Sequence, residues 1–279
     1  DLQLAIARKL VFSKWREALG GNVRCVASGS SALQVRLARI FNAAGIPLME
    51  GYGLTETSPV ISVNDARNDG LRFATVGKPI SNVQVRIAAD GEILCKGPNV
   101  MLGYYNEPEL TREVLDPDGW FHTGDIGEIT PEGFLRITDR KKEIFKTSGG
   151  KYVAPQVIEN KLKASRLVEQ AMVIGEYRKF PAVLIVPNFD ALKERCTQGG
   201  IPYSTREAAC NDPRVIACFK DAVDMVNKEL GHWEQLKKFA LLPQEFTIEG
   251  GELTPKLSLR RKAILENRKA VVERIYEGT

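Results

Sequence analysis

The sequence predicts a protein of mixed α/β and α+β architecture, and three observations predict it. A strand–helix–strand pattern near the start is typical of a parallel α/β layer. Two pairs of segments in the middle alternate or turn back in the manner of antiparallel hairpins. Beyond a charged connector, helices and strands form a second, smaller unit. We therefore expect the trailing part of a parallel α/β layer, a small antiparallel β-barrel-like subdomain and an α+β C-terminal domain.

Residues 1–68 are predicted to form the trailing part of a large N-terminal α/β domain. Apolar residues recur at helical spacing from Leu2 to Leu19, and Gly20 ends the pattern. A strand, a helix and a second strand then follow at residues 23–27, 32–44 and 46–49. Both strands lead into small or glycine-rich loops, where ligands bind in open α/β sheets. Because the chain opens inside a helical pattern, we expect it to be a piece of a longer protein with apolar surface exposed here.

Residues 69–140 are predicted to form a β-rich subdomain of the same large domain. One hairpin joins residues 83–87 to residues 92–95 through an Ala-Asp-Gly turn. A second hairpin joins residues 126–129 to residues 134–137. The two hairpins indicate a small barrel or curled sheet.

A charged connector, DRKKEIFK at residues 139–146, is the candidate domain boundary. Beyond this boundary, we assign residues 141–279 to a small α+β domain. Its expected elements are a helix, two strands, a long helix and a charged terminal helix, at residues 155–165, 170–175, 182–187, 213–230 and 262–277. For the long helix, the predicted cap is Asn211 or Asp212. Gly231 is predicted to end that helix.

Composition limits the functions that the chain can have. Of its 279 residues, 43% are apolar and 27% are charged, which fits a globular protein with its own core. The net charge of +4 is too small to indicate a nucleic-acid partner. Two histidines exclude a multi-histidine metal site, and five cysteines without a CxxC motif indicate reduced thiols in the cytoplasm. No apolar run reaches the ~18–20 residues of a membrane span.

A glycine-rich stretch, GYGLTET, starts at Gly51 and carries the strongest local signal of chemistry. Gly51 and Gly53 let the backbone approach a ligand closely, and Tyr52 offers a flat face for stacking. Thr55 offers a hydroxyl for a phosphate oxygen, and Glu56 offers a carboxylate oxygen suited to Mg²⁺. This combination suits a nucleotide, although the spacing matches neither a dinucleotide fingerprint nor a Walker loop. The alternative is a tight turn with an exposed tyrosine.

Three further stretches carry weaker signals. GWFHTGD ends at Asp125, and an aspartate after a glycine in a loop between strands can accept both hydroxyls of a ribose. Its alternative is an Asx-type turn with the aromatic pair in the core, and His122 is interpreted as a packing residue. Basic residues between Arg140 and Lys151, and again in residues 250–262, suit phosphate groups. The alternative for both basic stretches is solvated surface, which is the usual explanation of a charge run alone.

The order and spacing of these stretches resemble the adenylate-forming superfamily of acyl-CoA synthetases, adenylation domains and luciferases. The match is strongest to the long-chain fatty acid–CoA ligase branch. It is carried by SGSSAL, GYGLTET, GWFHTGD, ITDRKKEIFKTSGGKYVAPQVIE and ELTPKLSLRRK, at residues 28–33, 51–57, 119–125, 137–159 and 252–262. The resemblance implies two half-reactions. A carboxylic acid attacks the α-phosphate of ATP to give an acyl-adenylate, and the thiol of coenzyme A then displaces AMP.

The resemblance also implies the residues that bind the nucleotide. Six residues would surround the adenine, and Tyr52 among them would stack on the base. They are Gly29, Ser30, Ser31, Gly51, Tyr52 and Gly53. Thr55 would hydrogen-bond the α-phosphate, and Glu56 would hold Mg²⁺. Asp125 would bind the ribose hydroxyls with help from Arg140.

For the C-terminal part, the resemblance implies a moving domain. Lys142 lies at the hinge position, about which the small domain would rotate between an adenylating and a thioester-forming pose. Lys142 and Lys146 would approach AMP in one of these poses. After rotation, Ser148, Gly149 and Gly150 would line the tunnel for the pantetheine arm of coenzyme A.

The sequence departs from the superfamily pattern in two places. The usual catalytic lysine lies in a PKxxxGK-type motif, whereas this chain has PKLSLRRK. Lys256 is the first choice for the catalytic cation, and the alternatives are Arg260, Arg261 and Lys262. In addition, no Ser/Thr/Gly-rich phosphate loop precedes Gly51. We therefore expect a C-terminal fragment of a ligase roughly twice as long. Alone it should not adenylate efficiently, and robust pyrophosphate exchange by these residues would refute this.

Three functions stay open at this point. The first is activation of a long-chain fatty acid and its transfer to coenzyme A. The second is adenylation of another carboxylic acid, such as an aryl or amino acid, and the third is a non-catalytic nucleotide- or CoA-binding module. The expected partners are the small molecules fatty acid, ATP and coenzyme A, with no nucleic acid. We expect a cytoplasmic location, with contact at the inner face of a membrane left open and no indication of the oligomeric state.

Overall fold

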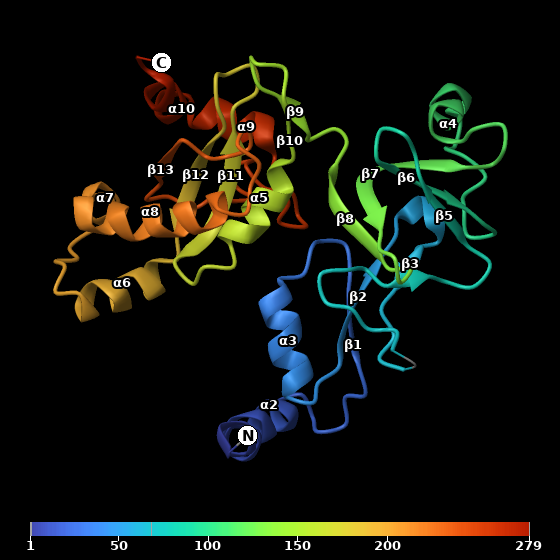
Figure 1. Cartoon of the computed structure of the whole chain (residues 1–279), viewed down its shortest axis with the longest axis horizontal. Helices are drawn as coiled ribbons and strands as arrows, with labels where there is room; N and C mark the ends of the chain where they lie inside the picture. Colours follow the sequence, from blue (N-terminus) through green and yellow to red (C-terminus); the bar gives the residue numbers. More distant parts are fainter. Residues whose placement is uncertain (1, 68, 279) are drawn as a thin grey trace. The chain divides into compact units, whose positions relative to one another are not determined.

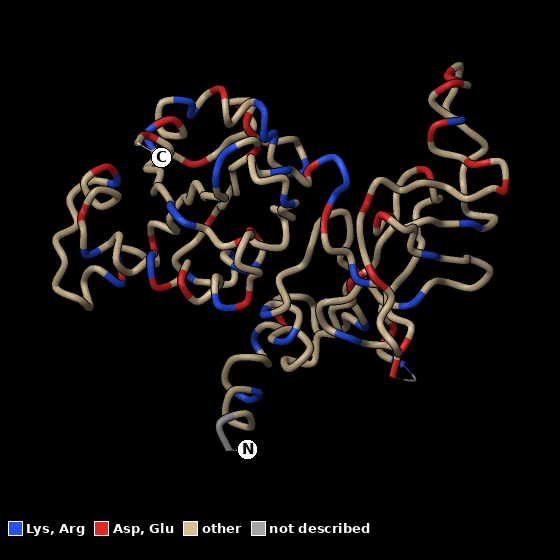
Figure 2. Tube along the Cα trace, turned by 45° about the horizontal axis from the view of Figure 1, so that its top comes forward, with Lys and Arg blue, Asp and Glu red and all other residues tan. Residues whose placement is uncertain are grey.

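The computed structural model describes residues 2–67 and 69–278. The chain divides into two compact units, Asp1–Lys141 and Lys142–Thr279 (Figure 1). Lysine and arginine, and aspartate and glutamate, are scattered along both units (Figure 2). No helix in the described ranges combines the length and apolar character needed to cross a bilayer. A further division of the first unit at residue 68 stays a prediction.

The first unit opens with a helical segment. It consists of α1 (Leu2–Ala7), the π-helical turn η1 (Arg8–Phe12) and α2 (Ser13–Ala18). Gly20 follows with a φ of 82°, which ends the helix as predicted. Large apolar side chains are exposed along the segment, namely Leu4, Ile6, Leu10, Val11, Trp15 and Leu19. The apolar surface expected in this region is therefore present.

A four-stranded sheet follows, with strand order β1-β2-β3-β4. Its region contains β1 (Val26–Ser28), α3 (Val35–Ala43), β2 (Leu48–Tyr52), the 3₁₀ turn η2 (Thr55–Thr57), β3 (Ser62–Val63) and β4 (Lys78–Pro79). β1 and β2 pair in parallel, and α3 connects them, which confirms the strand–helix–strand prediction (Figure 1). β3 and β4 add antiparallel pairs. They were not predicted because strands of two residues show no periodicity.

The second sheet of this unit is antiparallel throughout, with order β5-β6-β7-β8. Its region contains β5 (Gln84–Ile87), β6 (Glu92–Lys96), α4 (Pro108–Val114), β7 (Phe121–Ile129) and β8 (Leu135–Arg140). Both predicted hairpins are confirmed. The expectation that Asp125 lies in a loop is wrong, because β7 begins at Phe121 and includes it. The β6–β7 register is irregular between Glu92 and Leu94, and Gly124 adopts a φ of 71° within the strand.

The second unit contains a three-stranded sheet, β11-β12-β13, and a short hairpin, β9–β10, that precedes it in the sequence. The strands are β9 (Phe145–Lys146), β10 (Tyr152–Val153), β11 (Val168–Ile174), β12 (Ala182–Pro187) and β13 (Lys238–Leu241). β11 and β12 are antiparallel, as a simple turn between them predicts, whereas β13 is parallel to β12. Val183, Leu184 and Ile185 in the central strand are fully buried.

Six helices among the described residues complete the second unit. They are α5 (Pro155–Leu162), α6 (Phe189–Gln198), α7 (Arg206–Asn211), α8 (Pro213–Asn227), α9 (Arg261–Asn267) and α10 (Lys269–Tyr276). Asp212 caps α8 by accepting a hydrogen bond from the backbone N–H of Arg214. That helix ends at Asn227, so the prediction that Gly231 ends it is wrong. The terminal helix is divided at Arg268, and α6 and α7 were not predicted.

Candidate functional site

Two loops of small residues leave the same edge of the first sheet. β1 and β2 are parallel, and Ser28 pairs with Glu50, so the chain emerges from both strands side by side. Residues 29–31 are exposed after β1. A Cβ atom placed on Gly29 would lie 3.6 Å from the carbonyl oxygen of Gly51. The structure thus brings together the two loops that were predicted to surround an adenine.

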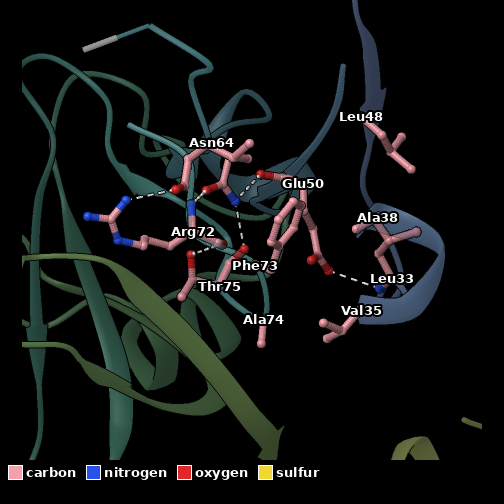
Figure 3. Close-up of a pocket in the computed structure, with 11 residues that line it drawn as sticks. Leu33, Val35, Ala38, Leu48, Glu50, Asn64, Arg72, Phe73, Ala74 and Thr75 are labelled. Carbon is pink, nitrogen blue, oxygen red and sulfur yellow. Dashed lines mark hydrogen bonds between the residues drawn. The ribbon is translucent and has the colours of Figure 1, made fainter. Parts of the chain in front are cut away.

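Glu50, which sequence reasoning missed, connects these loops. Its carboxylate accepts a hydrogen bond of 2.9 Å from the backbone N–H of Leu33, at the end of the first loop (Figure 3). The side chain of Asn64 donates to the carbonyl oxygens of Glu50 and Thr75. These residues line a cavity of about 10 Å³, which has room for roughly one water molecule. Burial raises the pKa of Glu50, and the hydrogen bond from Leu33 partly opposes this.

The glycine-rich stretch after β2 is held by its own backbone. Position 53 requires a glycine, because a Cβ atom there would lie 1.8 Å from the carbonyl oxygen of Pro59. The buried Thr57 hydroxyl accepts from the N–H of Leu54 and donates to its carbonyl oxygen. Thr55, the predicted phosphate ligand, is exposed on the outside of this turn. The turn is therefore rigid while its predicted ligand group stays accessible.

Glu56, the predicted Mg²⁺ ligand, is half-buried beneath a tyrosine that was not predicted. The hydroxyl of Tyr104 donates a 2.9 Å hydrogen bond to Oε1 of Glu56. The backbone N–H of Met101 donates to the Glu56 carbonyl oxygen. Burial and the neighbouring carboxylate both raise the pKa of Tyr104, so it stays a donor. Glu56 is thus fixed through both its backbone and its side chain.

Tyr52, Asp125 and Arg140 meet although they come from three strands. Oδ2 of Asp125 accepts a 2.7 Å hydrogen bond from the Tyr52 hydroxyl, and Oδ1 accepts a 3.1 Å bond from Nε of Arg140. Asp125 is 6% exposed, whereas more than half of the Arg140 side chain reaches solvent. Burial, followed by the Asp125 charge, raises the pKa of Tyr52. Each carboxylate oxygen has a second lone pair, so Asp125 can still accept ligand hydroxyls.

His122 does not pack in an apolar core. Its Nδ1 lies 3.0 Å from Oε2 of Glu92, and over a third of its side chain is exposed. Glu92 itself is buried, and sequence reasoning missed it. A carboxylate at the start of a strand gives no signal of burial in the sequence, because its partners come from other strands.

In the second unit, the predicted coenzyme A residues lie on the β9–β10 hairpin. Ser148, Gly149 and Gly150 form its exposed turn, and the N–H of Ser148 donates to the Arg178 carbonyl oxygen. Lys146 is exposed, with its ammonium 4.6 Å from the centre of the Tyr152 ring. Lys142 is the exposed first residue of this unit.

The candidate cations near the C-terminus differ in their surroundings. Lys256 is exposed, and so are Arg260 and Lys262. Arg261 is only 17% exposed and binds Glu159 through two hydrogen bonds of 2.8 Å. Its Nε also donates to Glu143 at 2.9 Å. Arg261 therefore serves as a structural ion-pair residue in the arrangement seen, which leaves the exposed residues as candidates for a catalytic cation.

The chain's acidic residues suit Mg²⁺ only in combination with phosphates. In the part of the chain that the structure describes, no three His, Cys, Asp or Glu residues gather into a metal cluster. Mg²⁺ is commonly held by one or two carboxylates, waters and nucleotide phosphates. Glu56, fixed beside the exposed Thr55, fits that single-carboxylate mode.

Comparisons with known proteins point in one direction. Residues 3–105 match the family described as AMP-binding enzyme, and residues 142–279 match the AMP-binding enzyme C-terminal domain. The chain is 42% identical, over 98% of its length, to the long-chain-fatty-acid--CoA ligase FadD15 of Mycobacterium tuberculosis. It is 38% identical, over 97%, to the long-chain-fatty-acid--CoA ligase 5 of Mus musculus. It spans 45% and 41% of these relatives, which is less than half of each.

Solved structures are similar in fold. The A-PCP didomain of the carboxylic acid reductase from Segniliparus rugosus, in complex with AMP, has a TM-score of 0.72 and 26% identity. The match covers 96% of this chain and 36% of that one. O-succinylbenzoate coenzyme A synthetase from Bacillus subtilis, with ATP and a magnesium ion, has a TM-score of 0.63 and 25% identity, covering 86% of this chain and 46% of that one.

Proposed function

The chain belongs to the AMP-binding enzyme family, and from that premise we propose that it is part of an ATP-dependent, AMP-forming long-chain fatty acid–CoA ligase. The names of its relatives support the substrate class. The observation that carries the proposal is the contact of Tyr52 and Arg140 with the buried Asp125, beside two glycine-rich loops. A fixed carboxylate with a half-exposed guanidinium suits a ribose that bears a phosphate.

In the first half-reaction, the chain's residues bind and orient the nucleotide. Asp125 accepts hydrogen bonds from the ribose hydroxyls, and the Thr55 hydroxyl donates a hydrogen bond to the α-phosphate. A carboxylate oxygen of the fatty acid then bonds to the α-phosphorus, and the bond to pyrophosphate breaks. When bound, Mg²⁺ supplies positive charge to the phosphates, and Glu56 would hold it. Lys256 is proposed to offset the charge that develops in this step.

In the second half-reaction, the thiol of coenzyme A loses its proton to solvent and its sulfur bonds to the acyl carbon. The bond from that carbon to the phosphate oxygen breaks, and AMP leaves. Lys142 is proposed as the hinge between the two half-reactions, and Lys146 as an AMP ligand. The hairpin turn at Ser148–Gly150 is proposed to receive the pantetheine arm. Two adjacent glycines, of which Gly150 has a φ of 74°, leave that turn without bulky side chains.

Titration of AMP into the 279-residue chain tests the nucleotide site. Asp125→Ala is expected to weaken binding by roughly tenfold to a hundredfold, because charge-assisted hydrogen bonds to the ribose are lost. Asp118→Ala removes an exposed carboxylate from the turn that precedes β7 and should leave affinity unchanged. If wild type and Asp125→Ala bind AMP alike, the ribose assignment is wrong.

A panel of acids on the full-length protein tests the substrate. Preference for long-chain fatty acids supports the proposal, whereas preference for aryl or amino acids selects the alternative adenylation activity. AMP binding without any adenylation by the full-length protein selects a non-catalytic nucleotide-binding module. We also propose a cytoplasmic location, which the five free cysteines support. Recovery of the full-length protein in a membrane fraction would instead favour peripheral membrane contact.

A further inference from the structure

One buried carboxylate, that of Glu92, gathers donors from three points around the nucleotide site. Glu92 opens β6 and is 4% exposed. Its Oε1 accepts a 2.9 Å hydrogen bond from the backbone N–H of Gly124. Its Oε2 accepts from Nζ of Lys141 at 2.9 Å and lies 3.0 Å from Nδ1 of His122. These are contacts of the Glu92 side chain, whereas β6 and β7 pair through their backbones.

The charge of Glu92 is maintained in this position. Burial raises its pKa, but donation from His122, Lys141 and Gly124 outweighs burial and holds the pKa below its usual value. The Lys141 ammonium also contacts Asp90 at 2.7 Å. Glu92 is thus an ionised acceptor with matched donors, which makes its hydrogen bonds strong and directional.

Glu92 acts on the residue that precedes Asp125. Gly124 is held on both sides, because its N–H donates to Glu92 and its carbonyl oxygen accepts from the N–H of Lys141 at 2.9 Å. With a φ of 71°, Gly124 adopts a conformation that sheet pairing alone does not impose. The direction in which the chain leaves Gly124 sets where the Asp125 carboxylate lies between Tyr52 and Arg140.

We propose that Glu92 is a positioning residue for nucleotide binding: it fixes Gly124, and thereby aims the Asp125 carboxylate at the ribose. The Glu92 carboxylate also forms an ion pair with Lys141, the last residue of the first unit. Glu92 thus contacts both the residue before Asp125 and the end of that unit. This inference rests on the proposed function, since the ribose is the ligand that Asp125 would bind.

The test compares Glu92→Gln with wild type for two ligands, AMP and 2′,3′-dideoxy-AMP. The glutamine keeps the shape of Glu92 and removes its charge. AMP affinity is expected to fall about tenfold, with little change for the dideoxy ligand, because only the ribose contacts are misplaced. Glu128→Gln is the matched control, since Glu128 is an exposed carboxylate of β7 paired with Arg136. An equal loss for both ligands would overturn the proposal.

A double-mutant cycle separates positioning from general structural support. If Glu92 acts through Asp125, then Glu92→Gln should cause no further loss of AMP affinity in an Asp125→Ala background. Additive losses contradict the proposal, because they show that Glu92 affects binding without Asp125.

Amide exchange of Gly124, followed by NMR without ligand, distinguishes failure of this inference from failure of the proposed function. Exchange is expected to be about tenfold faster in Glu92→Gln than in wild type or Glu128→Gln. If wild type binds no AMP, the proposed function fails, and an unchanged exchange rate still overturns the inference. Should Glu92→Gln not fold, Lys141→Met removes one donor and should speed Gly124 exchange about threefold. An unchanged rate in that variant would equally refute the proposal that Glu92 fixes Gly124.

Discussion

The hydroxyl of Tyr52 donates a 2.7 Å hydrogen bond to Asp125, and this bond joins β2 of the first sheet to β7 of the second. The residues are 73 positions apart. Tyr52 was expected to act through the face of its ring, whereas the structure also gives its hydroxyl a partner. The two roles are compatible and separable, since Tyr52→Phe removes only the hydroxyl, whereas Tyr52→Ala removes the ring as well.

Tyr52→Phe is expected to weaken AMP binding about fivefold, because Asp125 loses one donor while the aromatic face remains. Tyr52→Ala should weaken binding by about a further tenfold, through loss of stacking. Calorimetric titration of both variants measures the two effects. Equal affinities of the two variants would refute stacking, and a wild-type affinity for Tyr52→Phe would show that the hydroxyl does not assist the ribose site.

Tyr104→Phe should weaken Mg²⁺-dependent binding of ATP severalfold, because Glu56 loses the donor that fixes its carboxylate. AMP binding without Mg²⁺ should be unchanged. The neighbouring Tyr105 is 91% exposed, so Tyr105→Phe is the matched control. Titrations with and without Mg²⁺ measure the difference. A loss that does not depend on Mg²⁺ would contradict the role of Glu56 as a metal ligand.

Arg261→Met is expected to destabilise the second unit by about 3–5 kcal/mol, because the buried Glu159 loses its partner. Arg260→Met changes an exposed arginine and should cost less than about 0.5 kcal/mol. Urea unfolding followed by circular dichroism measures both. Similar midpoints for the two variants would show that the ion pair does not stabilise the fold.

Lys256→Met in the full-length ligase should slow adenylation by roughly a hundredfold, with no loss of folding stability, since Lys256 is exposed. Lys262→Met is the comparison, because Lys262 is exposed and also lies in the basic stretch. Pyrophosphate exchange measures the rate. If Lys262→Met is impaired and Lys256→Met is not, the catalytic cation has been assigned to the wrong residue.

Glu50→Gln should stabilise the first unit at pH 7 without weakening AMP binding. Burial raises the folded-state pKa of Glu50, so its ionised form is disfavoured in the folded chain. Stability from this group is therefore present below its unfolded pKa of about 4.5 and is lost as the pH rises through the folded pKa. The glutamine oxygen can still accept from Leu33. Melting curves at pH 7 and pH 4 should show the gain at pH 7 only, and an equal gain at both would contradict the burial argument.

The sequence by itself determined the local elements and the ligand-bearing loops. Apolar periodicity identified the strand–helix–strand unit and both hairpins, because side-chain spacing follows backbone geometry within one element. Small residues after β1 and β2 identified the two loops, since parallel strands end at a common edge. The parallel strand β13 was not predicted, because its pairing with β12 joins residues 56 positions apart, such as Ala182 and Lys238 (238 − 182 = 56).

Only the tertiary structure decided which polar groups meet. Arg261 and Glu159 lie 102 positions apart. Arg261 was therefore excluded as a catalytic cation by its burial against Glu159, which the motif does not reveal. Glu92 and its donors belong to separate segments that sheet pairing brings together. The physical reason is the same in both cases: periodicity records which face of an element is apolar, whereas a hydrogen bond between distant residues depends on how the elements pack.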